Sequence, residues 1–126
     1  MDDDRSLKDA AIEFLRLAAS GQVRQAYAKH VGPGFRHHNP HFRGDAVSLM
    51  EAMEANAAKN PHKVLSVRKA LRDGDHVAVF SHVEQQPGDP GAAVVHIMRF
   101  EGSRIVELWD VGQPVPPQSA NEHGMF

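Results

Sequence analysis

The chain lacks several features that would define common classes of protein. It has no cysteine, so disulfide bonds and thiolate metal sites are excluded. No apolar run approaches the ~20 residues of a membrane-spanning helix, and no signal-like apolar stretch follows the acidic start. The formal net charge is only -2, which creates no basic field for nucleic acid or an anionic membrane. We therefore expect a cytoplasmic protein that binds neither nucleic acid nor membrane.

Two catalytic motifs are also missing. The glycines lie at turns and not in a phosphate-binding loop between a strand and a helix, and no serine occupies a nucleophile elbow.

The composition is that of an ordinary globular protein, with 126 residues, 41% hydrophobic and 24% charged. This length favours one domain with one core, so residues 1–126 are expected to form a single domain. Nine histidines are many for a chain of this size.

The first half of the chain has the periodicity of helices. Apolar residues recur at helical spacing and predict helices over Leu7–Ala19, Val23–Lys29 and Ala46–Lys59, with Asp45 as the cap of the third. Gly32-Pro33-Gly34 is expected to end the second helix, and residues 35–44 to form an irregular segment.

From His62 onward the apolar period changes to two, which is typical of strands. The pattern predicts strands over residues 64–71, His76–Gln85, Ala93–Glu101 and Arg104–Val111, joined by short turns or a polar loop. Helices followed by an antiparallel meander define an α+β fold. The proline-rich end, residues 114–126, finishes in Met125-Phe126, and this apolar end suggests a tail that docks on a surface such as a second subunit.

The last two strands each carry one proton-handling group, His96 and Asp110. Because strand side chains alternate faces, each group shares a face with apolar neighbours. If the two faces form one surface, an imidazole and a carboxylate meet in an apolar pocket. The expected pocket face is Phe80, His82, Val94, His96, Met98, Leu108 and Asp110; the expected opposite face is Val79, Ser81, Val95, Ile97, Glu107 and Trp109.

Both faces of these strands are apolar, whereas a sheet with one solvent face should alternate more cleanly. We therefore expect a homodimer through the sheet. Arg99 falls on the face opposite His96, where an ion pair with Glu107 is its simplest role. Trp109 falls on that face as well, unless a β-bulge turns it toward the pocket.

Three stretches resemble the SnoaL-like branch of the nuclear-transport-factor-2-like (NTF2-like) superfamily: Phe35–Pro40, Val95–Val111 and Gln113–Pro116. The resemblance implies a cone-shaped α+β barrel of three N-terminal helices on a curved, mainly antiparallel sheet, often dimeric through that sheet. Family activities include polyketide cyclisation by aldol condensation, ketosteroid isomerisation, dehydration and epoxide hydrolysis. In the cyclases an aspartate on the last strand is the base and a histidine on the preceding strand lies nearby, which matches Asp110 and His96.

The chain departs from the branch at two positions. Close relatives tend to carry an acidic residue where His96 stands and a histidine where Leu108 stands. His38, in the His38–Pro40 motif, matches a histidine that usually lies near the pocket mouth.

The leading hypothesis is an enzyme without a cofactor that acts on a hydrophobic carbonyl compound. Asp110 would remove an α proton, and His96 and His38 would polarise or orient the substrate. The ligand contacts we expect are His38, Asn39, His82, Phe35, Met53, Phe80, Met98 and Trp109.

Three alternatives stay open. The first is a non-catalytic module that binds a small ligand in the same pocket. In the second, Asp110 and His96 are buried polar groups with structural partners. The third is a metal site formed by the cluster of His37, His38 and His41, or by His38 with His82 and His96. This third alternative is the least favoured, because no His-x-His or His-Glu-x-x-His spacing occurs, and the leading hypothesis includes no metal.

Overall fold

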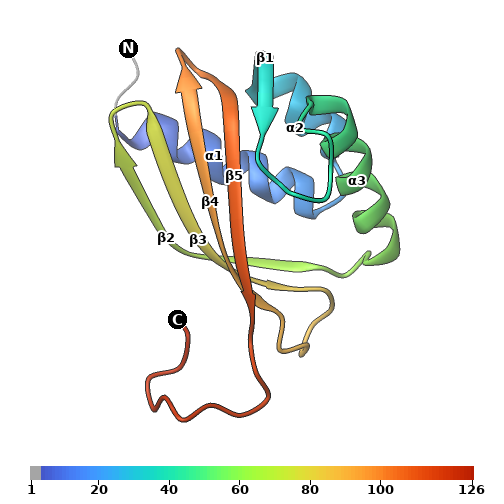
Figure 1. The fold of residues 1–126 in the computed structure, drawn as a ribbon, viewed down its shortest axis with the longest axis vertical. Coiled ribbons are helices and arrows are strands. Elements are labelled where there is room, and N and C mark those ends of the chain that lie inside the picture. The colour runs from blue at the N-terminus through green and yellow to red at the C-terminus, as the bar shows by residue number, and fades with distance from the viewer. Residues whose placement is uncertain (1–3) are drawn as a thin grey trace.

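A computed structural model describes residues 4–126, which form three helices and five strands. The helices are α1 (Asp4–Ala19), α2 (Val23–His30) and α3 (Ala46–Lys59), and the strands are β1 (Val31–His37), β2 (Val64–Asp73), β3 (His76–Glu84), β4 (Ala92–Glu101) and β5 (Arg104–Pro114) (Figure 1). The three predicted helices and four predicted strands are confirmed, with ends that differ by a few residues. Within residues 4–126, no helix combines the length and the apolar character needed to cross a membrane.

The strands form one curved sheet in the order β1-β5-β4-β3-β2. All neighbours are antiparallel except β1 and β5, which run parallel. The helices cover one face of this sheet, with α1 lying across it (Figure 1). The predicted α+β architecture is confirmed, and the sheet remains open because β1 and β2 are unpaired edges.

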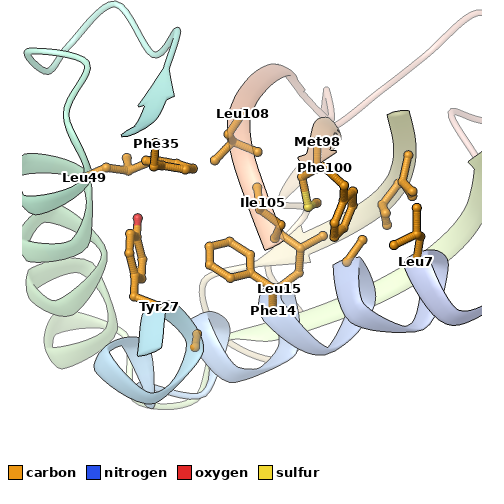
Figure 2. Close-up of a cluster of buried hydrophobic side chains, with 14 of the residues drawn as sticks. Leu7, Phe14, Leu15, Tyr27, Phe35, Leu49, Met98, Phe100, Ile105 and Leu108 are labelled. Atoms are coloured by element: carbon orange, nitrogen blue, oxygen red, sulfur yellow. The ribbon is translucent and has the colours of Figure 1, made fainter. Parts of the chain in front are cut away.

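The core lies between α1 and the concave face of the sheet (Figure 2). Leu7, Ala11, Phe14 and Leu15 recur at helical spacing and bury one stripe of α1. They pack in one cluster with four buried side chains of the last two strands, Met98, Phe100, Ile105 and Leu108. Tyr27 and Phe35 extend the cluster toward α3, with ring centroids 6.0 Å apart.

Strand β1 corrects the prediction that Gly32-Pro33-Gly34 is only a helix stop and that the chain is irregular from Phe35 onward. The motif lies inside the strand, which pairs in parallel with β5. Gly32 permits this close approach, since a Cβ there would lie 2.9 Å from Arg104 Cβ. The irregular segment begins only after His37.

The register of β3 corrects the predicted faces of that strand. Val79 lies directly opposite His96, and Phe80 lies opposite Val95. Directly paired residues share a face, so the face that carries His96 also carries Val79 and Ser81. Phe80 and His82 therefore lie on the convex, outer face.

The tail packs against this outer face of its own chain. The ring of Phe126 lies 4.5 Å from that of His82 and 5.6 Å from that of Phe80, measured between centroids. The guanidinium carbon of Arg68 lies 5.2 Å from the Phe126 centroid, a cation–π contact. The sequence predicted a docking tail, and in the structure it docks on its own sheet.

Gly91, where the β3–β4 loop enters β4, gives a test of the fold. It has φ +71°, and a Cβ would collide with the Val83 carbonyl oxygen. We expect Gly91→Ala to lower the free energy of unfolding by about 3 kcal/mol, from backbone strain and overpacking together. The matched control is Gly88→Ala, where φ is +87° but no atom lies within 4 Å, so only strain of about 1 kcal/mol is added. Urea denaturation measures both, and equal losses would contradict the packing described.

Candidate active-site cavity

A cavity of about 360 Å³ lies between α1, α3 and the concave face of the sheet. Its walls are mainly apolar, with a few polar groups. The lining residues are Leu15, Ala18, Ala19, Asn39, Phe42, Leu49, Ala52, Met53, Asn56, Lys63, Leu65, Val83, Gln85, Val94, His96 and Asp110. An apolar cavity with a few convergent polar groups is the usual form of a small-molecule site.

His96 and Asp110 meet in this cavity, as the sequence predicted. They are directly opposite each other in the antiparallel pair β4–β5. Side chains in such a pair have Cβ atoms roughly 5 Å apart. The next pair on the same face, Met98 and Leu108, is fully buried and belongs to the core cluster, not to the lining of the cavity.

The imidazole of His96 is held in its neutral form. Burial lowers the pKa of His96 to about 4, and the nearby carboxylate of Asp110 opposes this shift only in part. Nδ1 of the ring is buried and has no hydrogen-bond partner among residues 7–126. A buried polar atom without a partner is uncommon in folded proteins, and such atoms often mark functional sites.

Asp110 is oriented by the segment that follows β1. Asn39 Nδ2 donates a hydrogen bond to Asp110 Oδ2 at 3.1 Å. Asn39 is itself fixed: its backbone N–H donates to His37 Nδ1 at 3.1 Å, and its Oδ1 accepts from the backbone N–H of His41 at 3.0 Å. Within residues 7–126, no hydrogen bond reaches Asp110 Oδ1, so one carboxylate oxygen is free to face a ligand.

Of the predicted ligand contacts, Asn39 and Met53 line the cavity together with His96 and Asp110. Met53 is further placed by Tyr27, whose hydroxyl lies 3.6 Å from its sulfur. Phe35 and Met98 are buried in the core cluster and are not among the lining residues.

The other four predicted contacts lie on the outer face, which corrects the prediction. Phe80 and His82 are there because of the β3 register. Trp109 alternates with Asp110 on β5, and no bulge turns it inward. The ring of His38 stacks on Trp109, with centroids 4.9 Å apart and planes inclined by 8°.

Glu107 explains why His38 faces outward. His38 Nε2 lies 2.6 Å from Glu107 Oε2, and Arg36 and Arg99 donate to the same carboxylate at 2.9 and 3.0 Å. These partners hold the pKa of Glu107 at about 2, with Arg36 contributing most. The predicted Arg99–Glu107 ion pair is confirmed, as one part of a larger charged cluster.

Lys63 and Asn56 line the cavity but were not identified from the sequence. Nothing in their local pattern distinguishes them from solvated residues near a helix end. Ser81, expected on the opposite face, is fully buried on the inner face, although it does not line the cavity. Its Oγ has no hydrogen-bond partner in the described part of the chain. In that part of the chain, no group of three or more His, Asp or Glu residues is arranged to hold a metal ion.

No protein-family model and no curated protein matches this chain. Solved structures do match. An NTF2-like protein of unknown function from Cytophaga hutchinsonii has 20% identity and a TM-score of 0.66, covering 86% of this chain and 90% of that one. A proposed polyketide cyclase from Acidithiobacillus ferrooxidans has 18% identity and a TM-score of 0.69, covering 90% and 92%. A proposed isomerase of the SnoaL-like family from Agrobacterium tumefaciens has 11% identity and a TM-score of 0.69, covering 85% and 97%. The chain therefore has the NTF2-like fold that the resemblance predicted.

The lowered pKa of His96 predicts an acid-sensitive stability. The ordinary value is 6.5 and the folded value about 4, so between them the unfolded state binds more protons, and stability falls as the pH falls. From pH 7 to pH 5 this group alone should remove about 2 kcal/mol from the free energy of unfolding.

The test is urea denaturation of the wild type and of His96→Gln at both pH values. The variant should lose about 2 kcal/mol less than the wild type over this interval. His123→Gln, in the exposed tail, is the control and should behave as the wild type does. An unchanged pH dependence in His96→Gln would contradict the burial of a neutral imidazole.

Proposed function

We propose that this protein is a cofactor-independent enzyme that removes a proton next to a carbonyl group in an apolar ligand. The observation that supports this most strongly is the pairing of His96 with Asp110 in the cavity wall. Several solved structures with this fold are described as cyclases or isomerases, which fits the same class of chemistry.

Asp110 is the base in this proposal. Asn39 holds one carboxylate oxygen at 3.1 Å, which fixes the plane of the carboxylate and leaves the other oxygen for the substrate C–H bond. A positioned base of this kind contributes roughly 10²–10⁴-fold to the rate. The apolar side chains around it, such as Val94 and Leu49, keep water away while the proton is transferred.

His96 stabilises the developing enolate. A neutral imidazole has one N–H donor, and the low pKa of His96 ensures that this form is present at neutral pH. A donor directed at the carbonyl oxygen binds the enolate more strongly than the ketone, and so lowers the barrier. A protonated histidine would form an ion pair with Asp110 instead and weaken the base.

Aldol cyclisation, double-bond isomerisation and dehydration all pass through the same enolate. The residues of the cavity support this common step and do not favour one product over another. The second candidate is a ligand-binding module without turnover. It is favoured by the replacement of the expected histidine by Leu108, which is buried in the core and supplies no polar group to the cavity.

Asp110→Asn separates the two candidates. The amide keeps the shape and the contact with Asn39 but cannot accept the proton. We expect enzyme-dependent exchange of α protons for deuterium in apolar aryl ketones such as tetralone, followed by NMR in heavy water, to fall by about 10²–10⁴-fold in the variant. Asp73→Asn, an exposed carboxylate at the end of β2, is the matched control and should exchange at the wild-type rate.

Exchange that survives in Asp110→Asn would refute the assignment of the base. If the wild type binds these ketones without accelerating exchange, the binding module is the better account.

We also propose that the outer face of the sheet binds a second copy of the chain. Leu71 and Val111 are 67% and 69% exposed on this face, beside the half-buried Ile97 and Val95. Exposed apolar side chains gathered on one sheet face are typical of a subunit interface.

Light scattering coupled to gel filtration tests the dimer. We expect twice the mass of one chain at micromolar concentration, and the monomer mass for Val111→Asp, because a charge would be buried without a partner. Val47→Asp is the control, since Val47 is 55% exposed on α3, away from the sheet face. A monomeric wild type would contradict the proposal.

A further inference from the structure

Lys63 is the one strong cation in the cavity wall. Among the described residues that line the cavity, it is the only lysine or arginine, and Asp110 is the only carboxylate. The side chain is half-buried, and its ammonium bonds to the Asn56 carboxamide oxygen. No Asp or Glu in residues 7–126 forms an ion pair with it. A positive charge therefore lines an apolar cavity without an anionic partner from the protein.

The position of Lys63 is fixed by the turn between α3 and β2. The backbone N–H of Asn60 donates to the Asn56 carbonyl at 3.0 Å, and the Asn60 side-chain amide donates to the same oxygen at 3.0 Å. The backbone N–H of Lys63 then donates to the Asn60 carbonyl at 3.1 Å. These bonds close the turn and hold the lysine against the wall, so its ammonium is in place before any ligand arrives.

Lys63 and Asp110 lie at different ends of the lining. Asp110 is on β5 and Lys63 immediately precedes β2, with β4 and β3 between them in the sheet. Asp110 pairs with His96, His96 with Val79, and Val79 with Ala70, so Ala70 is the residue of β2 that is level with Asp110. Lys63 precedes Ala70 by seven residues, so the two groups are separated both across the strands and along them. Between them lie apolar side chains that include Leu65, Val83 and Val94.

From this arrangement we propose that Lys63 is the binding site for a carboxylate, and that the ligand is an elongated apolar acid whose other end lies beside His96 and Asp110. The assignment of the reacting carbonyl to that other end rests on the function proposed above. Asp110 reinforces the orientation, because its negative charge repels a carboxylate placed at the wrong end.

The physical state of the lysine agrees with this proposal. Burial lowers the pKa of Lys63, because the wall of the cavity solvates the ammonium less well than water does. A bound carboxylate would accept a charge-assisted hydrogen bond from the ammonium and so replace part of its lost solvation by water. Asn56 contributes only a neutral oxygen, so it holds the ammonium in place without neutralising its charge.

The test compares two probes of nearly the same shape, the anionic phenylhexanoate and the neutral phenylhexanamide, by isothermal titration calorimetry at neutral pH. We expect the wild type to bind the acid about tenfold more tightly than the amide, which corresponds to about 1.4 kcal/mol. Lys63→Met should bind both probes equally. Lys63→Arg should retain the preference, and so should Lys59→Met, whose lysine is exposed in the last turn of α3.

Two results would overturn the proposal. The first is that the wild type does not bind the acid, or binds it no more tightly than the amide. The second is that Lys63→Met still binds the acid more tightly than the amide. NMR titration of the Lys63 ammonium provides a second readout. Its pKa should rise when phenylhexanoate is added and stay unchanged with phenylhexanamide.

These measurements use binding and not turnover, so they are independent of the enzyme proposal. If Asp110→Asn retains activity while the acid preference depends on Lys63, only the base assignment fails. If the preference is absent while exchange depends on Asp110, only the carboxylate site fails.

Discussion

The antiparallel register between β4 and β5 determines the chemistry of this cavity. It sets His96 directly opposite Asp110 on the concave face, with the buried pair Met98 and Leu108 as the next rung. A slip of β5 by one residue would move Asp110 to the outer face, away from His96, and would expose Leu108. The register is protected by the same apolar contacts that form the core, so the fold and the site depend on one interaction.

Strand β5 serves both faces of the sheet. Its inward residues, Leu108 and Asp110, build the core and the cavity, while Glu107 and Trp109 on the outer face hold Arg36, Arg99 and His38. The segment after β1 is fixed at two points, since His38 is held outside by Glu107 and Asn39 is held inside by Asp110. The charged outer cluster therefore helps to place the residue that orients the carboxylate in the cavity.

Much of this structure follows from sequence pattern, and the failures have physical causes. The helices, the strands β2–β5 and the meeting of His96 with Asp110 were predictable, because a short turn at Gly102-Ser103 joins the last two strands. The face of β3 was not, since both of its faces are apolar and the long loop before β4 does not set the register. Strand β1 is formed by a distant parallel partner and not by its own Gly-Pro-Gly residues. Lys63 could not be identified because its role depends on which wall of a folded cavity it joins.

The most direct test of the whole account is a high-resolution crystal structure of the protein soaked with a long-chain aryl keto acid. The account predicts density along the cavity, with the carboxylate within hydrogen-bond distance of Lys63 Nζ and the ketone oxygen within hydrogen-bond distance of the His96 ring. The carbon next to that ketone should face the free oxygen of Asp110. A ligand bound elsewhere, or a cavity closed by Phe42 and Met53 with Asp110 turned to solvent, would contradict it.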